Sequence, residues 1–314
     1  MATDILEKPE TQTFNRVLQE KLKSMIDNKK VDITTIARGI NKSPTTISLY
    51  LSNKYAGRVD TLEKDLNTYV NTLEKSEKAE LKSLEFVETS IVKRIFNAAN
   101  MCQMRGKMGV CYGAPGIGKT TTINAYKKQT SGVIVIDPCE NISARTVLRH
   151  LADYFNLPYQ NNTTQDEYIE MISRKLDRNR YLIIVDEAEN LRIECFKALR
   201  KIYDKCKDTC GLLFVGTGDL YSILLGIKNG FPYISSRIGY LEHLDALKSE
   251  DIEKLVYQYF PNCDNVLLKT IAKVCNHNAR SIQNLLDLCL DITKSAKIEL
   301  NTDVIEAAKG KLLL

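Results

Sequence analysis

The chain has 314 residues, of which 44% are hydrophobic and 26% are charged, as expected for a protein with two or three folded domains. Its net charge of +5 is compatible with nucleic acid binding, but equally with no charged partner. The nine cysteines contain no CxxC pair and the three histidines have no metal-ligand spacing, so we expect neither a disulfide framework nor a zinc site. A polar N-terminus and the absence of a long apolar stretch predict a cytoplasmic protein without a membrane partner.

Residues 14–73 are predicted to form a small helical domain after a disordered tail at 1–13. Ser43 followed by Pro44 is a strong helix start, because the serine side chain caps the first turn and proline fits the first helical position. A stretch rich in Glu, Lys and Ser at 74–88 predicts a charged linker that is compatible with a helix. The helices expected in the domain cover 14–26, 33–40, 45–52 and 59–73.

From residue 89 the pattern changes to alternating strands and helices, which predicts an α/β core at 89–246. A helix capped by Thr89 or Ser90 comes first, and four short apolar runs then suit strands buried on both faces of a parallel sheet. These runs cover 108–112, 133–137, 181–186 and 212–216, and the helices between them 119–129, 143–155, 165–178 and 193–208. From residue 247 to 314 only helices are expected, at 249–259, 266–275, 281–295 and 302–309.

A glycine-rich run follows the first predicted strand and opens the next helix, which is the context that a Walker A phosphate loop requires. Its backbone amides surround an anion, Lys119 reaches the β- and γ-phosphates, and the Thr120 hydroxyl binds Mg²⁺. The pattern therefore predicts ATP and Mg²⁺ as cofactors. The residues expected to bind ATP are Gly113, Ala114, Pro115, Gly116, Ile117, Gly118, Lys119, Thr120 and Thr121.

The third apolar run ends in two carboxylates, Asp186 and Glu187. Open α/β sheets bind ligands at the carboxyl ends of their strands, so Asp186 is predicted to join Thr120 in the Mg²⁺ shell as a Walker B residue. Glu187 is predicted to activate the attacking water, which makes hydrolysis of ATP to ADP and phosphate the expected reaction. An isolated run of this kind is equally a strand ending in solvated charges, and the phosphate loop in the same domain favours the catalytic interpretation.

Three further residues are weaker candidates for the same site. Thr217 ends the fourth run and is a candidate to hold the water near the γ-phosphate, the alternative being a threonine that merely ends a strand. Arg237 is a candidate catalytic arginine that reaches the γ-phosphate of a neighbouring subunit. Arg280 begins a late helix and is a candidate to contact the same phosphate. Arginines are usually solvated surface residues, and the order of the motifs is what favours these two.

This order of motifs resembles the AAA+ ATPase family over residues 89–314. The resemblance implies a five-stranded parallel sheet with a small helical lid, and ATP bound between subunits of a ring or helical filament. Within AAA+, the chain is similar to the phage Mu transposition protein B family of target-DNA-selecting ATPases. The layout, the segment Phe86-Val87-Glu88-Thr89 and the segment Asn278-Ala279-Arg280 carry this similarity. Two positions depart from the family pattern: Thr217 stands where Asn is commoner, and Asn278 where Gly is usual.

The resemblance implies a phage, prophage or transposon protein that acts in the bacterial cytoplasm. It would assemble with ATP into a homo-oligomer on double-stranded DNA, without sequence preference, and would deliver that DNA to a DDE transposase and activate it. A helicase loader or an insertion-sequence helper ATPase is one alternative. A nucleotide-sensing helix-turn-helix transcriptional regulator is another.

Two regions carry candidate DNA contacts. Residues 33–52 fit a helix-turn-helix in which Ile47 and Leu51 face inward and Tyr50 lies on another face, the alternative being a helical bundle for protein contacts. Candidates to touch DNA or its phosphates there are Thr45, Thr46, Ser48, Lys54 and Arg58. In the α/β core, Arg145 and Arg149 are candidates to follow the duplex backbone, although charged helix faces are usually just solvated.

Overall fold

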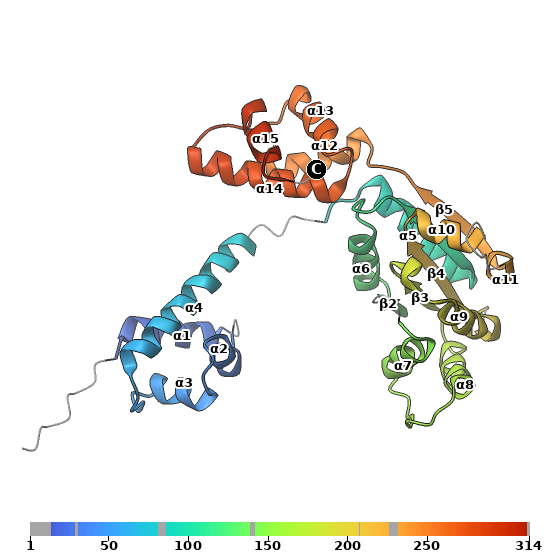
Figure 1. The fold of residues 1–314 in the computed structure, drawn as a ribbon, viewed down its shortest axis with the longest axis horizontal. Helices are drawn as coiled ribbons and strands as arrows, with labels where there is room; N and C mark the ends of the chain where they lie inside the picture. Colours follow the sequence, from blue (N-terminus) through green and yellow to red (C-terminus); the bar gives the residue numbers. More distant parts are fainter. Residues whose placement is uncertain are drawn as a thin grey trace, which may run out of the picture. The chain divides into compact units, whose positions relative to one another are not determined.

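A computed structural model describes residues 14–28, 31–80, 86–138, 142–206, 208–225 and 232–312. The predicted tail at 1–13 lies outside these residues, as does part of the predicted linker, 81–85. The chain divides into two compact units, residues 1–84 and 85–314 (Figure 1). No helix in the described ranges combines the length and the apolar character needed to cross a membrane.

The described residues of the N-terminal unit form four helices: α1 (Arg16–Asp27), α2 (Ile33–Gly39), α3 (Pro44–Leu51) and α4 (Val59–Glu80). All four expected helices are present, and α4 continues seven residues beyond the predicted end at 73, from 74 to 80. Leu22, Ile36, Ile47 and Leu66 are at most 1% exposed and form its core. The expectation that Tyr50 lies on an outer face of α3 is wrong. Its ring is fully buried in this core, and burial is tolerated because its hydroxyl donates to Glu63 Oε1 at 2.8 Å.

The second unit contains one sheet of five parallel strands in the order β2-β3-β4-β1-β5, so the predicted α/β fold is confirmed. The strands are β1 (Met108–Gly113), β2 (Val133–Ile136), β3 (Tyr181–Val185), β4 (Cys210–Gly216) and β5 (Ile238–Leu244). Four coincide with the predicted apolar runs. The fifth was not located in the sequence, because it is an edge strand whose residues alternate between exposed and partly buried.

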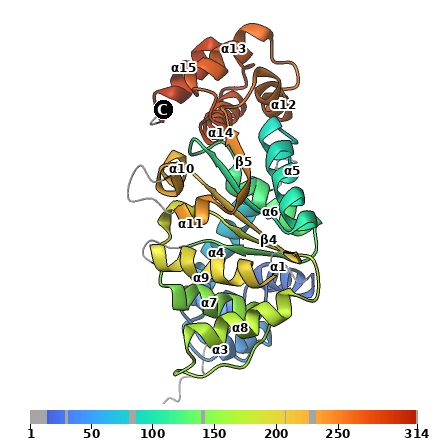
Figure 2. The same ribbon diagram turned by 90° about the vertical axis from the view of Figure 1, so that its right-hand side faces the viewer.

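Helices cover both faces of this sheet (Figures 1 and 2). One face packs on α5 (Ser90–Arg105), and α6 (Lys119–Gln129) lies beside it. The alternate side chains of β4, Leu212 and Phe214, join the buried cluster of the other face. That cluster includes residues of α7 (Ala144–Tyr154), α8 (Gln165–Leu176), α9 (Ile193–Cys206), α10 (Gly218–Leu225) and the short α11 (Pro232–Ser235).

The C-terminal lid consists of α12 (Ser249–Tyr259), α13 (Asn265–Val274), α14 (Ala279–Ala296) and α15 (Thr302–Lys309), which gather beyond the end of β5 (Figure 2). Val256, Leu286 and Ile305 are fully buried between these helices. A buried carboxylate joins the lid to the core: Asp251 in α12 accepts hydrogen bonds from Ser90 N at 2.7 Å and Ser90 Oγ at 2.5 Å. The first turn of α12 is thereby fixed to the start of α5.

Gly211 marks the closest approach of β4 to α5, and we expect Gly211→Ala to destabilise the second unit. A Cβ atom there would lie 2.3 Å from the Cys102 carbonyl oxygen, and backbone cannot yield as a side chain can. We expect the free energy of unfolding, measured by denaturant titration of the full chain, to fall by about 1–3 kcal/mol. Gly218→Ala is the control, because nothing lies within 4 Å of a Cβ atom at that position. Equal stability of the two variants would contradict the packing described.

Candidate nucleotide-binding site

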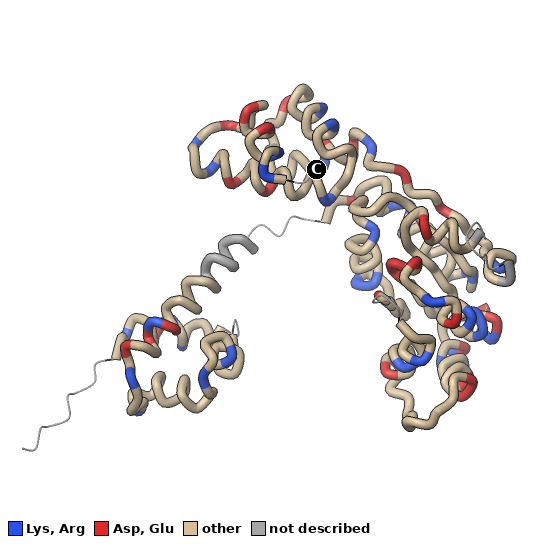
Figure 3. The backbone as a smooth tube through the Cα atoms, viewed as in Figure 1, with Lys and Arg blue, Asp and Glu red and all other residues tan. Residues whose placement is uncertain are grey.

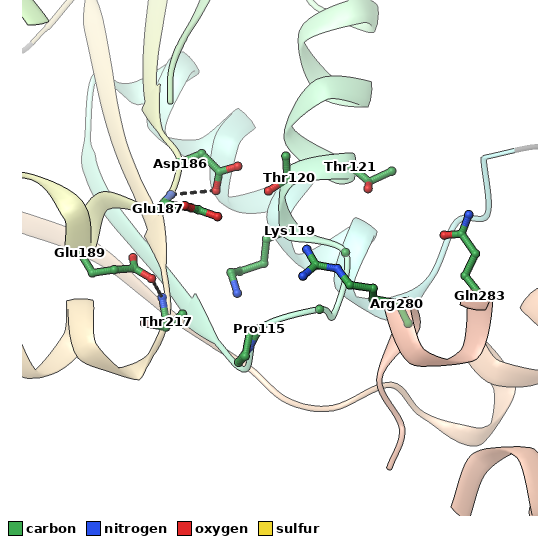
Figure 4. Close-up of a pocket in the computed structure, with 13 residues that line it drawn as sticks. Pro115, Lys119, Thr120, Thr121, Asp186, Glu187, Glu189, Thr217, Arg280 and Gln283 are labelled. Atoms are coloured by element: carbon green, nitrogen blue, oxygen red, sulfur yellow. Dashed lines mark hydrogen bonds between the residues drawn. The ribbon is translucent and has the colours of Figure 1, made fainter. Parts of the chain in front are cut away.

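A pocket lies at the carboxyl ends of β1, β3 and β4, beside the first turn of α14 (Figure 4). Ten of the thirteen residues that line it are predicted site residues: Pro115, Gly116, Gly118, Lys119, Thr120, Thr121, Asp186, Glu187, Thr217 and Arg280. The other three are Glu189, Ala279 and Gln283. The structure therefore brings the phosphate loop, the two acidic strand-end residues, Thr217 and Arg280 into one cavity.

The phosphate loop depends on two glycines with left-handed backbone conformations, Gly116 with φ of 77° and Gly118 with φ of 97°. Only glycine adopts these angles without steric cost. Gly118 precedes the first residue of α6, and no side chain caps that helix start. The amide groups of the first turn therefore remain available to an anion, and the helix dipole favours negative charge there.

The side chain of Lys119 is 8% exposed, and its Nζ donates to the carbonyl oxygens of Gly113 at 3.0 Å and Ala114 at 2.9 Å. Burial lowers the pKa of Lys119, and the carboxylates of Glu189, Asp186 and Glu187 oppose this shift. Gly113 and Ala114 thus contact Lys119 through their carbonyl oxygens. Ile117, another predicted contact, is instead buried in the protein interior at 2% exposure.

Asp186 directly follows β3, and its carboxylate is directed toward Thr120 (Figure 4). It is 2% exposed and accepts a hydrogen bond from Glu187 N at 3.0 Å. Burial raises the pKa of Asp186, and hydrogen bonds from the Thr120 hydroxyl and Glu187 N act in the opposite direction. A hydroxyl and a carboxylate are hard oxygen donors, and Mg²⁺ binds to few protein groups when phosphates and water complete its shell. This pair of residues fits that ion.

Glu187 has a left-handed backbone, with φ of 45°, although it is not glycine. Such strain costs about 1 kcal/mol or more and is concentrated at functional sites. The exposed side chain of Glu187 lines the pocket (Figure 4). Its Oε2 accepts a hydrogen bond from Asn190 Nδ2 at 3.2 Å. The carboxylate predicted to act as the base is thus open to solvent next to Asp186.

Glu189 was missed in the sequence and is the third carboxylate of the pocket. Its Oε1 accepts a hydrogen bond from Thr217 N at 3.1 Å, while its buried Oε2 has no partner among the residues that the structure describes. The hydroxyl of Thr217 in turn accepts from Asp219 N at 3.3 Å and so caps α10. Glu189 therefore joins the ends of β3 and β4. The signal for it was a third acidic residue two positions after Glu187.

The two candidate arginines lie in different places. Arg280 extends from the first turn of α14 toward Lys119 in the pocket (Figure 4). Arg237 does not line this pocket, and its Nε donates to Asp204 Oδ1 at 2.6 Å. Asp204 also pairs with Arg200, through its Oδ2, at 3.2 Å. Arg237 is thus bound to α9 of its own chain, outside the residues that line its own pocket.

The candidate DNA contacts also differ in their surroundings. Thr45, Ser48, Lys54 and Arg58 are exposed, whereas the Thr46 hydroxyl lies 3.0 Å from Ser43 Oγ at the start of α3.

Arg145 and Arg149 are held by their own chain. Arg145 donates to the Asn161 carbonyl oxygen, and Arg149 Nε donates to the Tyr168 hydroxyl at 3.4 Å. The lysines of α9 are interspersed with acidic residues (Figure 3), and Lys201 pairs with Asp166 at 3.0 Å. The basic charge near α7 and α9 is therefore partly neutralised within the unit.

Known proteins resemble the chain in sequence over most of its length. An AAA domain model matches residues 102–224. DNA transposition protein B of the Mu-like prophage FluMu of Haemophilus influenzae is 24% identical, over 82% of this chain and 90% of its own length. The ATP-dependent target DNA activator B of Escherichia phage Mu is 27% identical, over 82% of this chain and 85% of its own length. The chain therefore contains an AAA domain, and over most of its length it is similar to the transposition proteins B of Mu-like phages.

Solved structures agree on the fold. The Aeropyrum pernix ORC2 protein in its ADP form has a TM-score of 0.55 to this chain at 16% identity, and the match covers 74% of this chain and 72% of that chain. At this identity the likeness concerns the AAA fold alone. The AAA domain and the ATP-dependent relatives show that the chain is an ATPase, and the pocket that joins the phosphate loop, the acidic pair and Arg280 is its candidate site.

We expect Glu189→Gln to strengthen ATP binding about fivefold, because it removes one of three negative charges that repel a triphosphate while its amide oxygen still accepts from Thr217 N. Isothermal titration calorimetry with the full chain measures the affinity. Glu194→Gln, an exposed acidic residue outside the pocket, is the matched control and should leave the affinity unchanged. Weaker binding by the Glu189 variant would show that its charge has another role.

Proposed function

We propose that the chain is an ATP-dependent DNA-binding ATPase that assembles on target DNA without sequence preference and activates a DDE transposase. The pocket is the observation that carries the proposal, since it unites the groups needed to bind and hydrolyse ATP. The relatives named as transposition protein B and as ATP-dependent target DNA activator B support the choice of DNA and transposase as partners.

Each pocket residue has a role in this proposal. The loop amides and Lys119 bind the phosphates, and Thr120 with Asp186 holds Mg²⁺, which neutralises phosphate charge when bound. Glu187 orients the attacking water and accepts its proton, and its exposed position beside Asp186 leaves room for that water. Glu189 keeps the end of β4 in place, so that Thr217 lies near the terminal phosphate.

Arg237 acts in trans in this proposal. Its place outside the pocket of its own chain supports a contact with ATP bound to a neighbouring subunit. A contact of this kind is heterologous, so repetition along DNA produces a ring or helical filament. The γ-phosphate then joins adjacent subunits, and hydrolysis removes the group that holds them together.

DNA contact in the proposal comes from two places. The N-terminal unit, residues 14–73, binds the duplex through exposed residues of a helix-turn-helix formed by α2 and α3. A linker at 74–88 connects this unit to the ATPase core at 89–246, which the lid at 247–314 follows. Arg145 and Arg149 supplement this by exchanging their internal partners for phosphates of the DNA backbone. Because phosphate contacts dominate, DNA binding is steeply salt-dependent and has no sequence preference. The proposed place of action is the bacterial cytoplasm.

Two pocket variants test whether ATP controls DNA binding. We expect Lys119→Ala to lose ATP-dependent binding to random-sequence DNA, because the terminal phosphates lose their buried cation. Glu187→Gln should bind ATP normally but hydrolyse it at least about 100-fold more slowly, so that its DNA complexes persist. Fluorescence anisotropy with labelled DNA and a phosphate-release assay measure the two properties. Normal hydrolysis by Glu187→Gln would show that another group is the base.

A mixing experiment tests the role of Arg237 in trans. We expect Arg237→Ala alone to bind ATP but to hydrolyse it at least about tenfold more slowly in the presence of DNA. Addition of Lys119→Ala protein, which retains Arg237 but binds no ATP, should restore part of the hydrolysis. Lys119→Ala/Arg237→Ala protein is the control and should restore none. Lack of any rescue by the single variant would exclude the action of Arg237 across a subunit interface.

A further inference from the structure

The lid contacts the phosphate loop through two hydrogen bonds at the beginning of α14. The side-chain Nδ2 of Asn278 donates to the Pro115 carbonyl oxygen at 2.7 Å, and Arg280 N donates to the Gly116 carbonyl oxygen at 3.0 Å. Both acceptors belong to the loop that surrounds the phosphates. The position of α14 and the shape of the loop are thus linked directly.

Asn278 also caps the helix that it begins. Its Oδ1 accepts a hydrogen bond from Ser281 N at 3.1 Å, so one side chain uses its acceptor for the lid and its donor for the loop. Serine and aspartate would cap a helix as well as asparagine does, but neither has an amide donor. The cap alone therefore does not require asparagine at this position.

The turn before Asn278 has an uncommon backbone conformation. Asn276 and His277 both have left-handed backbones, with φ of 47° and 56°. Strain of this kind persists only where the surroundings impose it. The constraint comes from Leu247, whose N donates to the His277 carbonyl oxygen at 3.2 Å and whose carbonyl oxygen accepts from His277 Nδ1 at 2.9 Å.

The shape of the phosphate loop at Gly116 is complementary to the side chain of Asn278. A Cβ atom on Gly116 would lie 2.5 Å from Asn278 Oδ1, so the absence of a side chain at Gly116 gives the asparagine its place. Two residues after Asn278, the side chain of Arg280 extends into the pocket toward Lys119 (Figure 4). A helix start held on the loop by Asn278 therefore holds this guanidinium over the phosphate site.

We propose that Asn278 is a positioning residue that clamps the lid to the phosphate loop and thereby fixes Arg280 for selective binding of ATP over ADP. A guanidinium fixed over the site favours the ligand that carries the additional phosphate charge. If the start of α14 loosens, Arg280 loses its contact with the additional phosphate of ATP. The loop amides, which contact the phosphates shared by ATP and ADP, are affected less. The proposal rests on nucleotide binding at this pocket and is independent of DNA or a transposase.

Asn278→Ser is the sharpest test, because serine keeps the helix cap, adds no charge and is too short to reach Pro115. We expect the Kd for ATP to rise about tenfold and the Kd for ADP less than about threefold, while the melting temperature stays within about 2 °C of the parent. Titration calorimetry of the full chain with each nucleotide measures both values. Asn301→Ser is the matched control, since Asn301 caps α15 of the same lid by accepting from Val304 N at 3.0 Å and has no bond to the loop.

A double-variant cycle separates positioning from a general loss of structure. Arg280→Ala should lower ATP affinity and abolish most of the ATP preference, and Asn278→Ser should add no further loss in that background. Lys119→Ala, which lacks the main phosphate contact, gives the baseline for a site that binds neither nucleotide. Unchanged ATP preference in Asn278→Ser, equal losses for ATP and ADP, or additive effects with Arg280→Ala would each overturn the proposal.

Discussion

Burial of the Lys119 ammonium group is the constraint on which the ATPase unit depends. A cation that is 8% exposed is costly unless oxygen atoms surround it. The carbonyl oxygens of Gly113 and Ala114 contact it, and three carboxylates lie in the same pocket. Because β1 ends and α6 begins at this point, the open amides of the helix and the buried cation face the same space. A ligand rich in negative charge satisfies both requirements.

The groups around this cation come from separate elements that are hydrogen-bonded to one another. Glu189 after β3 accepts from Thr217 at the end of β4, and Asn278 of the lid donates to the loop after β1. Asp251 fixes the lid at a second point, the start of α5. Hydrogen bonds therefore link the loop to the lid, the lid to the start of α5, and the ends of β3 and β4 to each other. Such links between elements are consistent with the proposed dependence of assembly on the terminal phosphate.

Much of this arrangement could be predicted from residues whose local pattern has one physical meaning. Gly113 to Thr120 between a strand and a helix specified the loop, and the apolar run before Asp186 specified β3. The fifth strand could not be located, because it lies at the sheet edge and the polar residues Glu242 and His243 interrupt its apolar run. Tertiary contacts could not be predicted either, because they join residues with no local sequence pattern. Examples are the burial of Tyr50, the hydrogen bond between Thr217 and Glu189, and the hydrogen bond from Asn278 to Pro115.

The central claim is that the terminal phosphate of ATP decides whether subunits assemble on DNA. Electron microscopy of the full chain on random-sequence duplex DNA with Mg²⁺ tests it most directly, with ATP, ADP or no nucleotide in otherwise identical samples. We predict regular multi-subunit assemblies on the DNA with ATP, and none with ADP or without nucleotide. Assemblies of the same length and frequency in all three samples would contradict the claim.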